Sequence, residues 1–368
     1  MGKIGSPAAQ SFRFQGGFSL MKIVVLAGGI SPERDVSLCS ASLISNALLS
    51  KGHQVAFVDV YEGVEGGSDL DSLFVSPDSG KTFSYSIPET EPDLEALIAS
   101  HGGRRAPVGP GVLDLCQKAD AVFIGCHGGM GENGKLQAAL DCIDVPYTGS
   151  GYLACALAMD KHLSKTLIRY FGIPTADWML FDPKKDDVET VKSTIGFPCV
   201  VKPIGCGSSC GVSIVSDMKE WDAAIAYSTK YESVCLIEKK ISGREFSIGV
   251  LDGEALPIIE IRPKQGFYDY KNKYQANATE EICPAPLDPE QTKTAQGLAV
   301  AVHKALGLGN YSRVDFILSE EDGKFYCLEA NNLPGMTPNS LIPQEARAAG
   351  IGYEDLCEKL VLSASRKN

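Results

Sequence analysis

The chain has 368 residues, a formal net charge of −12 and 44% hydrophobic residues. This length exceeds what one simple hydrophobic core holds, so we expect two or three domains. No apolar run approaches the roughly 18 residues of a membrane span. No dense Lys/Arg block offsets the negative charge, which argues against nucleic acid and anionic membrane as partners. A small-molecule substrate fits the composition better.

Twelve cysteines are scattered along the sequence without a CxxC pair. Most lie in apolar runs, which is typical of buried free thiols in a reducing cytosol. Residues 1–20 show neither a strand period nor a helix period, and they lack the continuous apolar core of a signal peptide. We interpret them as a disordered leader or extension outside the folded part.

The folded part begins with an alternation of strand and helix patterns. Residues 22–27 form a short apolar run that ends in two glycines, and residues 54–60 form a second apolar run. Between them, residues 35–51 carry apolar side chains at helical spacing. Strand, helix, strand is the opening of an α/β domain with a parallel sheet.

The next stretch, residues 61–110, is rich in Gly, Ser, Pro and Asp and is interpreted as a looping insertion. After it we expect a strand at 121–125, a helix at 134–142, a strand and turn at 145–149, and one helix over 152–172. The later expected elements are strands at 197–203, 212–215, 234–239, 246–251, 256–262, 312–318 and 324–329 and a helix at 291–306.

A glycine-rich loop, residues 205–211, joins two of the expected strands. Glycine lets backbone N–H groups approach phosphate oxygens without a Cβ clash. Ser208 and Ser209 add hydroxyl donors, and Lys202 adds a positive charge just before the loop. The loop is not a Walker A motif, because neither Gly-Lys-Ser/Thr nor a helix follows. On its own it fits a plain hairpin turn at least as well as a phosphate site.

Three polar side chains, Asp315, Glu329 and Asn331, interrupt the apolar pattern of the last two expected strands. Arg313 and Asp315 are two residues apart, as are Glu329 and Asn331, so each pair lies on one face of its strand. Carboxylate and amide oxygens suit Mg²⁺. The alternative is a half-exposed polar face of the sheet, although burying two carboxylates without a cation is costly.

Glu33 and His127 each follow an expected strand at its carboxyl end, where open α/β sheets bind ligands. An acid at position 33, after the Gly-Gly turn, could hold an ammonium group. Each residue also has an ordinary interpretation. Glu33 fits a solvated charge near a helix N-terminus, and His127 fits a loop histidine.

Nine segments carry a resemblance to a known family, in the order LAGGISPERDVS, HGGMGENG, PYTGSG, AMDKHLSK, VVKPIGCGSSCGV, LIEKKISGREFS, GFYDYKNKY, RVDF and CLEANNLPGMTPNSLIP. From about residue 21 to its end, the chain resembles the D-alanine–D-alanine ligases of the ATP-grasp superfamily. The insertion at 61–110 matches least well. Many motifs in the right order make this resemblance specific, although any one of them is weak evidence.

The resemblance implies an α/β fold, α+β overall, with three-domain ATP-grasp architecture. An open parallel-sheet substrate domain would cover residues 21–149. A central ATP-grasp domain with the glycine-rich loop would cover residues 150–242. A C-terminal ATP-grasp domain with the magnesium and substrate sites would cover residues 243–368. ATP would lie between the last two domains.

The resemblance also assigns roles on the nucleotide side. Asp315, Glu329 and Asn331 match the ligands of two Mg²⁺ ions, for which Mn²⁺ is an alternative. The nucleotide positions are Lys161, Lys202 and Lys273 for the phosphates, Glu238, Lys239 and Ile241 for adenine, and Glu245 for ribose. Residues 266–281, with four aromatic side chains, would form a lid that shields an acyl phosphate from water.

On the substrate side, Glu33 matches the acid that holds the ammonium of the first D-alanine, and His127 lies near that subsite. The other implied roles are Ser208 and Tyr274 for closing the site onto Glu33, Arg313 and the Gly335 N–H for binding the oxyanion, and Ser340 and Leu341 for fixing the second D-alanine. The implied protein is a cytoplasmic homodimer that makes D-alanyl-D-alanine for peptidoglycan precursors.

Several alternatives remain at this stage. Tyr274 and the Ser340-Leu341 pair favour dipeptide formation over the D-alanine–D-lactate and D-alanine–D-serine relatives. Biotin carboxylase-like ligases, a non-catalytic nucleotide-binding protein and a Rossmann dehydrogenase fit the motifs less well. The chain departs from the family at Asn332-Leu333, where a Thr-Ser type is more common, and at Cys206 and Cys210 in the glycine-rich loop.

Overall fold

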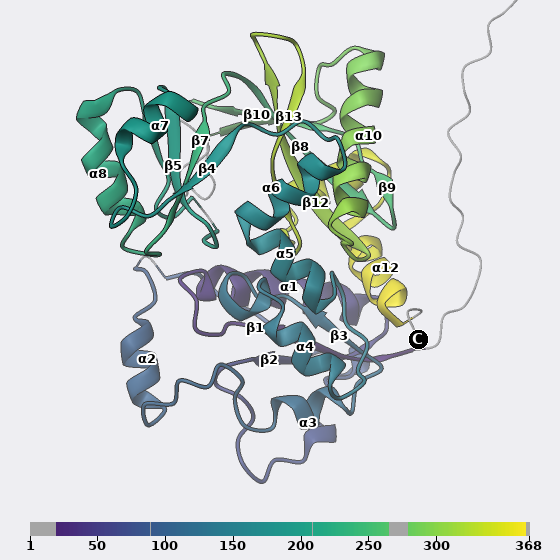
Figure 1. Ribbon diagram of the computed structural model, residues 1–368. Helices are drawn as coiled ribbons and strands as arrows, with labels where there is room; N and C mark the ends of the chain where they lie inside the picture. Colours follow the sequence, from purple (N-terminus) through teal and green to yellow (C-terminus); the bar gives the residue numbers. More distant parts are fainter. Residues whose placement is uncertain (1–19, 89, 208, 265–278, 366–368) are drawn as a thin grey trace, which may run out of the picture.

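The computed structural model describes residues 20–88, 90–207, 209–264 and 279–365 (Figure 1). Apart from Leu20, the expected leader lies outside these residues. The described part contains three sheets, with three, four and six strands. The alternation of parallel and antiparallel sheets with helices confirms the predicted α/β, α+β overall class. None of the described helices is both long enough and apolar enough to cross a bilayer.

The first sheet is parallel, with the strand order β2-β1-β3. Its strands are β1 (Lys22–Ala27), β2 (Gln54–Asp59) and β3 (Ala121–Ile124), and α1 (Arg34–Ser50) follows β1. Five of the six residues of β1 and all four of β3 are buried. Strands that are covered on both faces have continuous apolar sequences. This pattern is visible in the sequence, and the strands of this sheet were therefore predicted correctly.

The insertion is mostly loop, as expected, but it carries short helices and is pinned to α1. Asn46 donates to the Phe83 carbonyl at 2.8 Å and accepts from the Phe83 N–H at 2.9 Å. These bonds fix the path of the loop over the first sheet. The elements between β2 and β3 are η1 (Leu70–Leu73), η2 (Pro77–Ser79), α2 (Leu94–Ser100) and α3 (Val112–Cys116).

The single helix predicted over 152–172 is wrong, because the chain forms two helices there. These are α5 (Tyr152–Met159) and α6 (Lys161–Tyr170). Between them, the Asp160 carboxylate accepts a hydrogen bond from the Leu163 N–H at 2.9 Å. An aspartate in this position caps the start of a new helix. The spacing of apolar residues runs on across this break between the two helices, and the spacing alone therefore did not reveal it. Before it, α4 (Lys135–Asp141) forms as expected.

The second sheet is antiparallel, with the order β4-β7-β5-β6. Helices α7 (Val188–Thr194) and α8 (Met218–Ser228) cover this sheet in Figure 1. Val191, Trp221 and Ala224 from these helices pack in one hydrophobic core with Val201 and Ile237 of the sheet. The strands are β4 (Trp178–Phe181), β5 (Cys199–Pro203), β6 (Ser213–Val215) and β7 (Cys235–Lys239).

The third sheet has the order β11-β10-β8-β12-β13, and β9 pairs with β8. A buried core joins it to α10, α5 and α6. Its elements are β8 (Gly243–Leu251), β9 (Glu254–Ala255), β10 (Ile259–Pro263), β11 (Thr279–Ile282), α10 (Pro289–Ala305), β12 (Tyr311–Ser319) and β13 (Phe325–Asn331).

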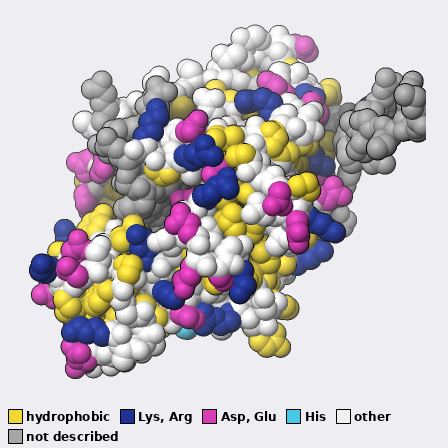
Figure 2. All heavy atoms as spheres, turned by 90° about the horizontal axis from the view of Figure 1, so that it is seen from above, with side chains coloured by type: hydrophobic (Ala, Val, Ile, Leu, Met, Phe, Trp, Pro, Cys, Tyr) yellow, Lys and Arg dark blue, Asp and Glu magenta, His cyan; other side chains and the backbone are white. Residues whose placement is uncertain are grey.

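The last two helices, α11 (Leu341–Ala348) and α12 (Tyr353–Ser365), return to the start of the chain. Helix α12 packs against α1 and β3, and its residues Leu356 and Leu360 belong to the same buried core as β1. The first and last segments are therefore held together by one hydrophobic core. Figure 2 shows basic and acidic side chains interspersed over one face of the molecule.

Candidate active site

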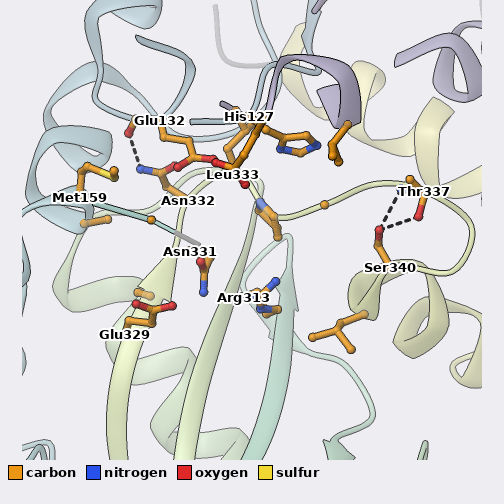
Figure 3. Close-up of a pocket in the computed structure, with 18 of the residues that line it drawn as sticks. His127, Glu132, Met159, Arg313, Glu329, Asn331, Asn332, Leu333, Thr337 and Ser340 are labelled. Atoms are coloured by element: carbon orange, nitrogen blue, oxygen red, sulfur yellow. Dashed lines mark hydrogen bonds between the residues drawn. The ribbon is translucent and has the colours of Figure 1, made fainter. Parts of the chain in front are cut away.

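A cavity of about 370 Å³ lies where the three sheets approach one another. Figure 3 shows polar side chains from loops and strands pointing into it. Nine of the residues proposed from the sequence line this cavity, namely Glu33, His127, Lys161, Arg313, Glu329, Asn331, Gly335, Ser340 and Leu341. Three other predictions, Ser208, Lys273 and Tyr274, lie outside the described residues. Of the expected lid at 266–281, only residues 279–281 are described, and they begin β11.

The N-terminal part contributes Glu33, directly before α1, and His127, just after β3. Their two loops touch at Gly128, which has a φ of 69°. A Cβ on Gly128 would lie 2.9 Å from Glu33 Oε2 and 2.5 Å from Ser31 Oγ, so only glycine fits there. Burial lowers the pKa of His127, and the nearby Glu33 carboxylate only partly opposes this effect. Burial thus favours the neutral form of the imidazole.

Glu132 is a site residue that the sequence interpretation missed. Its Oε1 accepts a hydrogen bond from the Gly128 N–H at 2.8 Å, and the residue lines the cavity. Burial raises the pKa of Glu132 to about 7, and the charges of Glu33 and Glu329 add to this rise. This side of the cavity thus gathers carboxyl groups. The only signal in the sequence was an acid inside the HGGMGENG motif.

Strands β12 and β13 form the floor of the cavity. Arg313 pairs with Asn331 in register, and Asp315 pairs with Glu329. Asp315 accepts hydrogen bonds from Arg313 Nε at 3.0 Å, from Arg313 Nη2 at 2.8 Å and from Asn331 Nδ2 at 2.9 Å. Ser247 on β8 donates a further bond to Asp315 at 2.9 Å. Asp315 is thus buried below the floor and orients two side chains that face the cavity.

The predicted ligands at this floor are two carboxylates and one amide. Glu329 and Asn331 line the cavity, whereas the Asp315 carboxylate lies just below them and accepts hydrogen bonds from Ser247, Arg313 and Asn331. Among the described residues, no group of three or more His, Cys, Asp or Glu side chains is arranged to hold a metal ion. Mg²⁺ does not require such a cage, because it is usually bound by one or two carboxylates together with substrate phosphates and waters. The chemistry of these oxygen donors therefore fits Mg²⁺ with a nucleotide.

Among the positions predicted to bind the nucleotide, a buried carboxylate is shared by two lysines. Glu238 Oε2 lies 2.7 Å from Lys165 Nζ and 3.2 Å from Lys202 Nζ. Burial acts to raise the pKa of Glu238, but the two lysines outweigh it and hold this pKa below its ordinary value. Lys165, only 1% exposed, also donates to Thr175 Oγ1 at 2.6 Å. The cluster carries more positive than negative charge, as an anion-binding region requires.

Lys161 links this region to the cavity. Its Nζ donates to the Cys206 carbonyl at 2.6 Å, and its N–H donates to the Ile204 carbonyl at 3.0 Å. Burial lowers the pKa of Lys161, and Glu329 partly restores it. The N–H groups of Ile204 and Gly205 donate to the Glu232 carboxylate at 2.8 and 2.9 Å. Glu232, which the sequence interpretation missed, anchors the start of the glycine-rich loop.

The remaining predicted nucleotide positions lie outside the cavity lining. Ser209 has a φ of 58° in the glycine-rich loop. Lys239 is exposed at the end of β7, and Ile241 is half-buried just after it. Glu245 lies on β8, in register with Ile317 of β12. Two further residues that the sequence did not single out, Ile87 of the insertion and Glu281 of β11, do line the cavity.

The opposite end of the cavity is formed by the turn before α11. Ser340 Oγ accepts a hydrogen bond from the Thr337 N–H at 3.0 Å and lies 2.8 Å from Thr337 Oγ1 (Figure 3). A Cβ on Gly335 would lie 3.0 Å from Ser340 Oγ. The Gly335 backbone thus lies close to the Ser340 hydroxyl, and Leu341 also lines the cavity.

Comparisons with known proteins agree along almost the whole chain. Family models described as D-ala D-ala ligase N-terminus and D-ala D-ala ligase C-terminus match residues 22–150 and 167–362. The D-alanine–D-alanine ligase of Pediococcus pentosaceus is 44% identical over 352 residues, covering 94% of this chain and 98% of that protein. That of Lacticaseibacillus casei is 41% identical over 344 residues, covering 93% and 95%. The crystal structure of the Bacillus anthracis ligase complexed with ATP superposes with a TM-score of 0.71 at 29% identity, covering 94% and 98%.

Proposed function

The chain belongs to the D-alanine–D-alanine ligase family, and we propose that it joins two D-alanine molecules to D-alanyl-D-alanine while ATP is converted to ADP and phosphate. The product serves peptidoglycan precursor synthesis. One observation carries the proposal. A single cavity is lined by an acid for an ammonium group, Glu33, by a lysine for phosphate, Lys161, and by a guanidinium for an oxyanion, Arg313. Relatives of the same length support it.

In the first step, a carboxylate oxygen of the first D-alanine attacks the γ-phosphorus of ATP. The bond to ADP breaks, and an acyl phosphate forms. Lys161 and Lys202 neutralise charge that develops on the phosphate oxygens, which is the main protein contribution to such transfers. Asp315, Glu329 and Asn331 would hold Mg²⁺, which when bound supplies further positive charge to these oxygens.

In the second step, the amine of the second D-alanine attacks the acyl carbon. The C–N bond forms, phosphate leaves, and the amine loses its proton. Arg313 and the Gly335 N–H are the proposed donors to the tetrahedral oxyanion. The two bonds from Arg313 to Asp315 hold the guanidinium in a fixed orientation before the substrate arrives. Ser340 and Leu341 are proposed to fix the second D-alanine.

Glu33 is the proposed partner of the first ammonium group, with His127 beside it. The roles of Ser208, Lys273 and Tyr274 remain predictions, as does closure of the lid. The adenine and ribose roles of Glu238, Lys239, Ile241 and Glu245 are likewise proposed from the family. For Glu238, the two lysines that share its carboxylate support a place close to the phosphates.

An ADP-release assay with D-alanine, Mg²⁺ and ATP tests the function, with the product identified by mass. We expect D-alanyl-D-alanine, and slower ADP release when D-serine or D-lactate is offered as the second substrate. ADP release that does not depend on any D-amino acid would contradict the proposal. Faster ADP release with D-lactate, together with an ester product, would indicate a D-alanine–D-lactate ligase instead.

Two further expectations accompany this function. Cytoplasmic location is supported by the free cysteines, several of them buried, since reducing compartments keep thiols unpaired. The homodimer stays a prediction. Light scattering coupled to size-exclusion chromatography tests it, with a mass twice that of the chain as the expected result.

A further inference from the structure

Asn332 stands where this chain departs from the Thr-Ser type expected from its family resemblance. It follows β13 directly, next to Asn331, and only 4% of its surface is exposed. Its Nδ2 donates to the Glu132 carbonyl at 2.8 Å and to the Cys155 carbonyl at 3.2 Å. Because both partners are carbonyl oxygens, only the NH₂ group of the amide can face them.

These two bonds connect three parts of the molecule. Glu132 belongs to the loop that follows β3 of the first sheet, and Cys155 lies on α5. Asn332 itself extends from the strand that carries Glu329 and Asn331. Figure 3 shows the bond from Asn332 to Glu132 spanning the cavity wall above Asn331. One side chain thus holds the N-terminal loop and α5 against the end of β13.

The contacts continue from Glu132 to the ammonium subsite. Glu132 Oε1 binds the Gly128 N–H at 2.8 Å, and a Cβ on Gly128 would lie 2.9 Å from Glu33 Oε2. His127 is the adjacent residue. The position of this loop therefore sets how far Glu33 and His127 lie from Asn331 and the floor of the cavity.

We propose that Asn332 is a positioning residue that fixes the first D-alanine subsite relative to the phosphate-binding floor. The inference rests on the proposed ligase function. A carboxylate attacks a phosphorus atom productively only within a narrow range of distance and angle, and a small displacement is costly. A threonine at this position has a single O–H donor, so it can satisfy only one of the two carbonyls.

The test compares three variants of Asn332. Asn332→Ala removes both bonds, and we expect kcat/KM for D-alanine to fall about tenfold or more. ATP affinity without D-alanine should stay within about twofold, since the bonds do not touch the nucleotide lysines. Asn332→Thr should give an intermediate loss. Asn332→Asp should lose the most activity, because its carboxylate would face two carbonyl oxygens.

Asn310 offers a matched control. It is 6% exposed and also spans distant segments, since it accepts from the Gly149 N–H and donates to the Leu360 carbonyl, each at 2.8 Å. It lies outside the cavity lining. Asn310→Ala should lower the melting temperature and leave kcat/KM for D-alanine unchanged.

The outcomes separate the inference from the function. Wild-type kcat/KM for D-alanine in Asn332→Ala, or in Asn332→Thr if the alanine variant misfolds, would overturn the positioning role. A lower melting temperature with unchanged kcat/KM, as in Asn310→Ala, would also overturn it. Failure of the wild-type protein to release ADP with D-alanine would instead refute the ligase function.

Discussion

Two parts of the cavity differ in charge. The part formed by the N-terminal loops gathers the carboxyl groups of Glu33 and Glu132 beside His127. Glu132 also borders the glycine-rich loop, because a Cβ on Gly207 would lie 3.7 Å from its Oε2. The part proposed to bind the nucleotide contains Lys161, and near it Lys165 and Lys202 share one glutamate. Although the chain carries a net charge of −12, three lysines lie close together where phosphates are proposed to bind. The acids lie where an ammonium group is proposed to bind.

This difference in charge would orient both reactants in one cavity, with the D-alanine ammonium toward the acids and the ATP phosphates toward the lysines. Electrostatic groups positioned before the reaction need no reorganisation when charge develops. Arg313 of β12 lines the same cavity and is the proposed donor to the oxyanion. The following variants test each part of this arrangement, from the largest expected effect to the smallest.

The largest effect is expected at Arg313. Arg313→Ala should lower kcat by about 10² or more, because an oxyanion donor typically contributes about 3 kcal/mol to the barrier. ATP affinity should change much less. Steady-state ADP release and nucleotide binding by calorimetry measure the two quantities. A kcat within about twofold of wild type would remove the guanidinium from the mechanism.

The next effect concerns the part that contains the lysines. Lys165→Met removes a buried ammonium that contacts Glu238 and Thr175. Lys202 would then be the one lysine left to pair with the Glu238 carboxylate, and it would be less available to a phosphate. ATP affinity should therefore fall about tenfold and the free energy of unfolding by roughly 1–3 kcal/mol. Calorimetry with ATP and urea unfolding measure these changes. Unchanged ATP affinity would show that the cluster is structural only.

Lys192 is the matched control for this variant. Its ion pair with Glu189 lies on the surface, with 36% of the lysine side chain exposed. Lys192→Met should change stability by less than about 0.5 kcal/mol, because exposed pairs contribute little. ATP affinity should be unaffected.

The smallest effect on activity is expected at Glu132, where the change is one of stability and depends on pH. The pKa of Glu132 rises from its ordinary 4.5 to about 7 on folding, so the folded state binds this proton more tightly than the unfolded state. Stability from this group is therefore full below pH 4.5 and is lost as the pH rises through 7. Relative to Glu132→Gln, the wild type should lose roughly 2–3 kcal/mol of stability between pH 5 and 8. Urea unfolding measures the free energies of both proteins. The same wild-type-to-variant difference at pH 5 and pH 8 would contradict this prediction.

The sequence predicted the parts of the fold that depend on local pattern. The runs at β1 and β3 are continuous and apolar because both faces of these strands are buried. The predicted helix over 152–172 failed because Asp160, a local helix cap, interrupts an otherwise unbroken apolar period. Helices α7 and α8 were not predicted, since their buried side chains are few and depend on the facing sheet.

For the site, residues that stand out locally were predicted, and residues defined by distant partners were not. Glu33 and Arg313 interrupt apolar or glycine-rich patterns, so they were visible in the sequence. Lys165 looks like any helical lysine until Glu238 on β7 is brought beside it. Asn332 was noticed only as a departure from the family, because its partner Glu132 lies 200 positions away.

The most direct test of the charge arrangement is a structure with a non-hydrolysable ATP analogue, Mg²⁺ and D-alanine. The account predicts the terminal phosphate beside Lys161 and the Glu329–Asn331 floor, with the D-alanine ammonium against Glu33. A D-alanine bound with its ammonium among the lysines, or a terminal phosphate outside the cavity, would contradict it.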